Sequence, residues 1–159
     1  NNPDRAVGRG GVGGVGGVGG MGSGGISSGA LGNPNDPNSV AYFNQKIGDT
    51  VRFVVDQSTL TPEAQATLSA QAQWLNAHPG ATAIIEGHAD EQGTSEYNLA
   101  LGARRASSVQ AYLISQGVAG ARLKTVSYGK ERPIAVCSEE SCLAQNRRAV
   151  TVIGAGSGV

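Results

Sequence analysis

Several features that mark whole classes of protein are scarce in this chain. There are only one Trp, two Phe and four Tyr among 159 residues, too few for an aromatic platform on which nucleic-acid bases stack. Twelve basic and twelve acidic residues cancel, so no net charge attracts nucleic acid or anionic lipid. We therefore expect no nucleic-acid partner.

Long apolar runs are missing as well. No stretch approaches the roughly 18 consecutive apolar residues that a membrane-spanning helix needs. No segment has the charged start and apolar centre of a signal peptide. The chain begins at Asn1 rather than at an initiator Met, so we expect a mature or trimmed form.

Glycine, in contrast, is abundant and concentrated near the N-terminus. Residues 1–38 contain GGVGGVGGVGG followed by Gly/Ser and Asn/Pro segments, which leave almost nothing to bury. A coil of this composition has a root-mean-square span of roughly 30–37 Å. We expect residues 1–38 to be a flexible linker. It is either a tether or an expression remnant, and the composition favours the tether.

Residues 39–154 have the pattern of a folded domain, and residues 155–159 form a short tail. We predict strands at 51–55, 81–86, 124–128 and 148–153. Between them we predict one helix that starts at Thr61-Pro62 and stops before Pro79-Gly80, and a second from Ser95 to Gln116. Apolar residues recur at helical spacing on both; they are Ala64, Leu68, Ala72 and Leu75, then Gly102, Ala106, Val109 and Leu113. This alternation predicts an α/β fold, an α+β two-layer sandwich in which a mixed sheet of about four strands carries helices on one face.

The most informative run is EGHADEQGTSEYNLALGARRASSV, at residues 86–109. An acidic loop containing Asp90 and Glu91 leads into a helix that carries Arg104 and Arg105. Arg can hold a carboxylate through a two-point fork, and Asp can accept hydrogen bonds from an ammonium group. The run therefore suits a ligand that carries both charges.

Helical spacing places three residues of the second helix on one stripe. Asn98, Leu101 and Arg105 lie at positions i, i+3 and i+7. We expect Arg105 to contact the ligand and Arg104 to be solvated. The alternative is that Arg105 only pairs with Asp90 or Glu91 and pins the loop, since surface ion pairs are common and often contribute little.

The chain resembles the family of OmpA-like peptidoglycan-binding domains, and within it the branch found in peptidoglycan-associated lipoproteins. The resemblance rests on GHADEQGTSEYNLALGARRASSVQAYL, then GV and RL, TVSYGKERP and QNRRAV, in this order and at the expected spacing. About 60 residues match, which is far more specific than one short motif. The resemblance implies an α/β sandwich that binds the diaminopimelate residue of the peptidoglycan stem peptide non-covalently.

The resemblance also implies the site residues. The key acid of the family corresponds to Asp90 and its key Arg to Arg105. Other positions in the same pocket correspond to Asp56, Asn98, Leu101 and Arg147. The first strand departs from the family pattern, because Val55 replaces a Phe and Thr59 replaces an Asp. We leave Val55 out of the site and expect this departure to weaken or widen the pocket.

The function implied by the resemblance is tethering of the outer membrane to the cell wall, as part of the Tol-Pal envelope system. The expected partners are peptidoglycan, a TolB-like periplasmic protein, and the outer membrane through an N-terminal lipid anchor that this chain does not contain. The expected location is the periplasmic side of the outer membrane. Alternatives are the wall-binding domain of another envelope machine, a flagellar stator or an outer-membrane barrel, and a periplasmic peptidoglycan hydrolase.

An enzymatic or metal-dependent activity has little support in the sequence. Glu86, His88, Asp90 and Glu91 are potential metal ligands, but catalytic zinc takes three protein ligands and only one His lies here. We expect His88 to be a structural residue, and we expect no catalytic residue, metal or cofactor.

The only two cysteines are Cys137 and Cys142, within CSEESC. Their spacing does not match a CxxC redox or zinc pair. They are either a disulfide or two inert thiols, and the extracytoplasmic location implied by the family favours a disulfide that acts as a local staple.

Overall fold

The structure, a computed structural model, describes residues 31–136 and 139–154. The described residues divide into two compact units, one within residues 47–152 and one made of residues 31–46 together with 153–154. The larger unit contains the expected site. In the smaller unit, a short helix α2 (Val40–Tyr42) is capped by Ser39, whose hydroxyl accepts a hydrogen bond from the Tyr42 N–H, and is followed by a π-helical segment, Phe43–Gly48.

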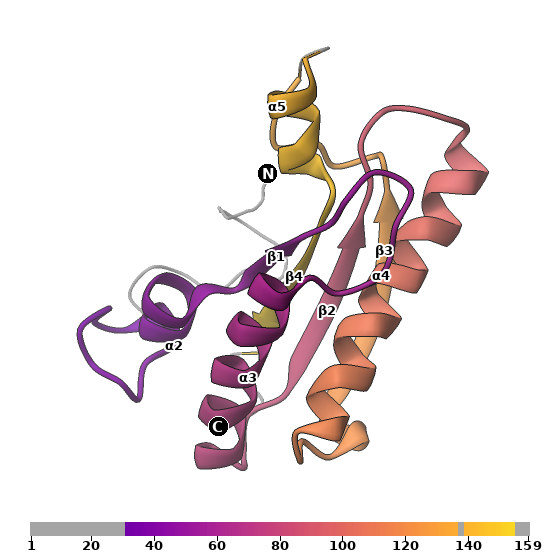
Figure 1. Cartoon of the computed structure of the whole chain (residues 1–159). Coiled ribbons are helices and arrows are strands. Elements are labelled where there is room, and N and C mark those ends of the chain that lie inside the picture. The colour runs from indigo at the N-terminus through magenta and orange to yellow at the C-terminus, as the bar shows by residue number, and fades with distance from the viewer. Residues whose placement is uncertain (1–30, 137–138, 155–159) are drawn as a thin grey trace. The chain divides into compact units, whose positions relative to one another are not determined.

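A mixed four-stranded sheet organises the larger unit (Figure 1). Its strands are β1 (Thr50–Arg52), β2 (Ala83–His88), β3 (Leu123–Gly129) and β4 (Arg148–Ile153), in the order β1-β4-β2-β3. β1 and β4 pair antiparallel, whereas β2 and β3 are parallel. The predicted fold class, a mixed sheet with helices packed on it, is confirmed.

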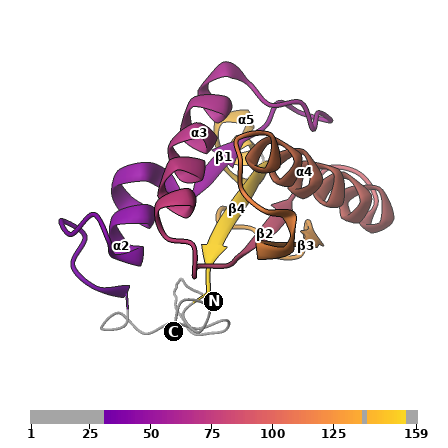
Figure 2. The same ribbon diagram turned by 90° about the horizontal axis from the view of Figure 1, so that it is seen from below.

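Two helices lie on the same face of this sheet (Figure 2). α3 (Pro62–Ala77) packs on β1, and α4 (Ser95–Ser115) packs on β2 and β3. Each begins at a threonine cap: the Thr61 hydroxyl accepts from the Ala64 N–H, and the Thr94 hydroxyl accepts from the Tyr97 N–H. These caps satisfy backbone donors that the first helical turn leaves free.

The predicted apolar stripes of both helices are buried and form the core with the inner residues of the strands. α4 approaches β2 closely at two glycines. A Cβ atom on Gly87 would lie 1.7 Å from the Gly102 carbonyl oxygen. Only residues without a side chain allow this contact, which fixes the start of α4 beside the end of β2.

Three strands differ from their predicted bounds, and of these β3 is only one residue longer at each end than predicted. β1 ends at Arg52 rather than at residue 55, because the chain turns and the Gln57 N–H donates to the Val54 carbonyl. β2 starts at Ala83 rather than at residue 81, because the Ala81 N–H donates to the His78 carbonyl in the turn after α3.

Shorter elements complete the described chain. A 3-10 turn, Gly120–Arg122, precedes β3, and α5 (Glu140–Leu143) runs into a second 3-10 turn, Ala144–Asn146, before β4. Among residues 31–136 and 139–154, no helix combines the length and the apolar character that crossing a membrane requires.

Candidate ligand-binding pocket

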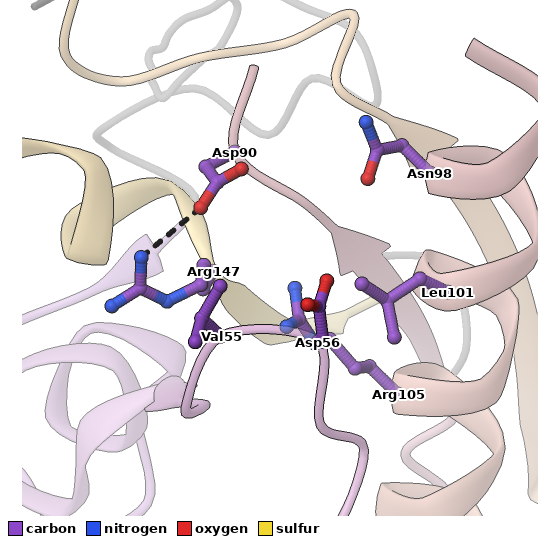
Figure 3. Close-up of a pocket in the computed structure, with 7 residues that line it drawn as sticks. All are labelled: Val55, Asp56, Asp90, Asn98, Leu101, Arg105 and Arg147. Atoms are coloured by element: carbon purple, nitrogen blue, oxygen red, sulfur yellow. Dashed lines mark hydrogen bonds and ion pairs between the residues drawn. The ribbon is translucent and has the colours of Figure 1, made fainter. Parts of the chain in front are cut away.

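A small pocket forms where the segment after β1, the loop after β2, α4 and the start of β4 meet (Figure 3). It is a narrow recess, partly open to solvent, whose side chains leave almost no free space between them. Its lining residues are Val55, Asp56, Asp90, Asn98, Leu101, Arg105 and Arg147. The structure thus places all six predicted site residues in one pocket and adds Val55, which the sequence analysis had left out.

Asp90 and Arg147 form the one direct ion pair among these lining residues (Figure 3). The Arg147 Nη1 atom donates to the Asp90 Oδ2 atom at 3.0 Å, and both side chains are buried. The second carboxylate oxygen of Asp90 accepts from the Gln92 N–H at 2.9 Å. Burial opposes the charged form of Arg147, but the hydrogen bonds that Arg147 donates to Glu140 and Asp90 outweigh this effect and raise the pKa of Arg147.

Arg105 is fully buried, with 0% exposure, and its guanidinium is bound to backbone oxygens. The Nε atom donates to the Gln57 carbonyl, Nη1 to the His88 carbonyl and Nη2 to the Val54 carbonyl, at 2.8, 2.9 and 3.2 Å. Arg105 therefore ties the segment after β1 to the end of β2. The alternative, that Arg105 pins the loop by pairing with Asp90 or Glu91, is wrong about the partner. Asp90 pairs with Arg147, and Arg105 binds backbone carbonyls instead.

Removal from water destabilises the charged form of Arg105. Burial lowers the pKa of this residue to about 10, although the nearby Asp90 carboxylate opposes the shift. Within the described part of the chain, no carboxylate lies within ion-pair distance of Arg105. Its neighbour Arg104 is exposed, as predicted.

Asp56 has an unusual backbone conformation for a residue with a side chain, with φ at 60°. Asp tolerates this left-handed region better than most residues, yet the conformation costs energy and is often found at functional sites. The Tyr97 hydroxyl donates to Asp56 Oδ1 at 3.1 Å. This bond links the segment after β1 to the first turn of α4 beside the pocket.

The remaining lining residues of α4 are set by helical spacing. Asn98 and Leu101 are buried on the same stripe as Arg105. The Asn98 Nδ2 atom donates to the Gln92 carbonyl at 2.7 Å, which holds the loop between β2 and α4 over the helix. Because the same loop positions Asp90, the acid and the helix are fixed relative to each other.

His88 is a buried residue outside the pocket lining, as the structural interpretation predicted. Its Nε2 atom lies 3.2 Å from the Glu86 carboxylate. Burial, supported by the positive charge of Arg148, lowers the pKa of His88 to about 4 and outweighs the opposing effect of Glu86. Among the residues that the structure describes, no group of three or more His, Cys, Asp or Glu side chains is arranged to hold a metal ion.

The pocket as a whole presents two carboxylates and two guanidinium groups beside the apolar side chains of Val55 and Leu101. It is too narrow to enclose a drug-sized ligand, which needs a pocket of roughly 300 Å³. It therefore suits the end of a larger ligand, and its charges suit an end with both a positive and a negative group. No Ser, Cys or His side chain lines it, so the lining supplies no nucleophile of the kinds that such residues provide.

Comparisons with known proteins agree with this architecture. Residues 52–148 match the model of the OmpA family. The chain belongs to the OmpA family.

Individual relatives of this OmpA-family chain span most of its length. It is 57% identical to a peptidoglycan-associated lipoprotein of Mesorhizobium japonicum over 122 residues, which cover 76% of this chain and 73% of the relative. The crystal structure of the peptidoglycan-associated lipoprotein from Burkholderia pseudomallei is 43% identical, with a TM-score of 0.67, and the match covers 76% of this chain and 99% of that one. The C-terminal domain of Helicobacter pylori MotB shares the fold, with a TM-score of 0.62, 22% identity, and coverage of 66% of this chain and 83% of that one.

The sequence analysis missed three contributors to the pocket region. Val55 lines the pocket, Tyr97 binds Asp56, and Glu140 binds Arg147. Tyr97 could have been found from the sequence, because it is an aromatic residue directly beside Asn98. The contact of Glu140 with Arg147 depends on how the segment before β4 folds. Cys137 lies outside the described residues, so its pairing with Cys142 stays a prediction.

Proposed function

We propose that this chain is a binding module for peptidoglycan and that its pocket holds the diaminopimelate residue of the stem peptide. The observation that carries the proposal is the arrangement of Asp90, Arg147 and a buried Arg105 in one small pocket. The side chain of diaminopimelate ends in one carbon that bears both an amine and a carboxylate. The pocket offers opposite charges to both groups.

In this proposal the two arginines have different roles. The ligand carboxylate is attracted by Arg105, since a buried cation without a carboxylate partner gains most from an anion. The ligand ammonium lies near the carboxylates of Asp90 and Asp56. Arg147 keeps the Asp90 carboxylate in place.

The cellular role we propose is a tether between the outer membrane and the cell wall, within the Tol-Pal system. The identity to peptidoglycan-associated lipoproteins supports an envelope-associated lipoprotein. We further propose that it is anchored in the outer membrane through an N-terminal lipid, with residues 1–38 as the linker and residues 39–154 as the binding domain. A TolB-like periplasmic protein would be a second partner, and its surface would overlap the wall-binding site, so that the two partners exclude each other.

Two other functions have less support. A wall-binding domain of a flagellar stator or of an outer-membrane barrel would share the fold, but the high-identity relatives are lipoproteins. A peptidoglycan hydrolase would need a nucleophile or a metal, and the lining residues provide charge and shape only. The proposed function is therefore binding without catalysis.

Sedimentation with purified diaminopimelate-type peptidoglycan tests the proposal. We expect the wild-type chain to sediment with the wall material and to release no soluble fragments from it. Asp90→Ala and Arg105→Ala should remain in the supernatant. The neighbouring variants Glu91→Ala and Arg104→Ala should behave as the wild type, because Glu91 and Arg104 are exposed and do not line the pocket.

Circular dichroism must show that each variant is folded, since Arg105 also binds three backbone carbonyls. Equal retention of folded Asp90→Ala and Arg105→Ala would contradict the pocket assignment. Release of soluble fragments by the wild type would contradict the non-enzymatic role.

A further inference from the structure

Arg147 is held from two sides by two different carboxylates. Its Nη1 atom donates to Asp90 Oδ2 at 3.0 Å and lies 3.4 Å from Glu140 Oε1. Its Nη2 atom donates to Glu140 Oε2, and its Nε atom donates to the Phe53 carbonyl at 3.1 Å. Every nitrogen of the guanidinium group therefore has a partner, and Glu140 occupies the two-point fork.

The two carboxylates differ in their surroundings. Asp90 is buried and lines the pocket, whereas Glu140 does not line the pocket and its side chain is 70% exposed. Glu140 is the first residue of α5, in the segment that leads to β4. It therefore contacts Arg147 without taking up the space open to a ligand.

This arrangement has a consequence for Asp90. The Asp90 carboxylate is fixed by the Gln92 N–H on one oxygen and by Arg147 on the other. Without Glu140, the Nη2 atom of a buried guanidinium would lose its only hydrogen-bond acceptor among the described residues, and the group would gain from turning toward solvent or into the pocket. Either movement would weaken the support of the pocket acid.

We infer that Glu140 is a positioning residue of the binding site, which acts through Arg147 to hold Asp90 for the ammonium group of the ligand. This inference rests on the proposed function and extends the site to α5. Exposed ion pairs commonly contribute little. This pair differs because its cation is buried and its geometry is two-point, the arrangement in which Arg–carboxylate pairs are strongest.

Isothermal titration of the full chain with a soluble diaminopimelate stem peptide tests the inference. We expect Glu140→Ala to weaken binding about fivefold, as for the loss of one well-formed ion pair. Glu140→Asp should recover part of the affinity, because it restores the charge. The matched control is Glu139→Ala, since Glu139 is the adjacent exposed acid and its side chain makes no capping bond to α5.

A second measurement reports on Arg147 without any ligand. In the free protein, nitrogen-15 NMR should show separate, slowly exchanging Nη–Hη signals of Arg147 in the wild type and in Glu139→Ala. We expect Glu140→Ala to collapse these signals through free rotation of the group. Together with a preserved fold, this result would support positioning rather than a general loss of stability.

Several outcomes would overturn the inference. Unchanged Arg147 signals in Glu140→Ala, or an affinity within twofold of the Glu139→Ala control, would show that the pair is idle. Tighter binding by Glu140→Ala would show that Glu140 competes with the ligand carboxylate. If the wild type binds no stem peptide, the proposed function fails, and the Arg147 signals alone decide whether Glu140 orders the guanidinium.

Discussion

Adjacent arginines on α4 have opposite environments, and the helical period decides which of them belongs to the site. Arg105 is completely buried and gives its hydrogen bonds to three carbonyls, whereas Arg104 is exposed. A residue that both shapes a pocket and supplies its charge cannot be replaced by an equivalent charge elsewhere. Lysine offers a single ammonium group rather than a planar fork, so it would not reach three separate carbonyls.

His88, a single residue next to the pocket region, makes the stability of the fold depend on pH. Its backbone carbonyl accepts a hydrogen bond from Arg105, and its imidazole is buried. Burial lowers the pKa of His88 from 6.5 to about 4, so the folded state favours the neutral ring. The unfolded chain binds more protons than the folded chain between pH 6.5 and about pH 4, and stability must fall as the pH falls through this window.

We predict that His88 lowers the free energy of unfolding by about 3 kcal/mol between pH 7 and pH 4. Each unit of difference between the folded and unfolded pKa corresponds to about 1.4 kcal/mol. The stabilising contribution of neutral His88 is fully present above the pKa of the unfolded state and is lost below the pKa of the folded state. Urea unfolding of the wild type and of His88→Gln at pH 7, 5.5 and 4 measures it. The variant should lose less stability on acidification, and parallel pH profiles for the two proteins would contradict the burial effect.

At the scale of secondary-structure elements, local sequence signals predicted both long helices. Thr61-Pro62 and the run that starts at Thr94 carry cap residues, and apolar residues recur at helical spacing. The same periodicity placed Asn98, Leu101 and Arg105 on one stripe, as the pocket lining shows. These predictions depend on neighbours in the sequence, which is why they could be made.

Contacts between distant elements could not be predicted in the same way. The Asp90–Arg147 pair joins residues 57 positions apart. Arg122 closes the end of α3 by donating to the carbonyls of Ala81, Leu75 and His78, and nothing near Arg122 in the sequence indicates this. The length of β1 was overestimated because Val54 and Val55 suit a strand locally, whereas the tertiary turn that supplies carbonyls to Arg105 removes them from the sheet.

The contact between α4 and β2 leads to an element-scale prediction. In Gly87→Ala, the added methyl group would lie 1.7 Å from the Gly102 carbonyl oxygen, a backbone atom of α4. The helix must move away, and we expect a loss of about 3 kcal/mol in unfolding free energy, at the upper end for overpacking. Peptidoglycan binding should weaken as well, because Arg105 lies one turn beyond Gly102.

The control for this variant is Gly120→Ala. Its added methyl group would meet only the flexible end of Ile114, at 3.4 Å, so stability should change little. Urea unfolding of both variants compares the two positions directly. A Gly87→Ala chain as stable as Gly120→Ala would show that α4 and β2 are not held in close contact.

At the scale of the whole molecule, a small pocket and the linker proposed for residues 1–38 would suit reversible attachment. One charged ligand end in a narrow pocket offers little contact area, so each bond to the wall should be weak. Many tethered copies facing a polymer with repeated stem peptides would still hold two surfaces together through avidity. The proposed linker, if flexible as its composition predicts, would set the effective concentration without fixing the distance between them.

The central claim is that the pocket recognises a carbon that carries both an amine and a carboxylate. Isothermal titration of the full chain with two soluble stem peptides, one with diaminopimelate and one with lysine at the same position, tests this most directly. The peptides differ only in that carboxylate, for which the structure offers the buried Arg105. We predict measurable binding of the diaminopimelate peptide and at least tenfold weaker binding of the lysine peptide, in keeping with the loss of a charge-assisted hydrogen bond. Equal affinity for both peptides would contradict the account.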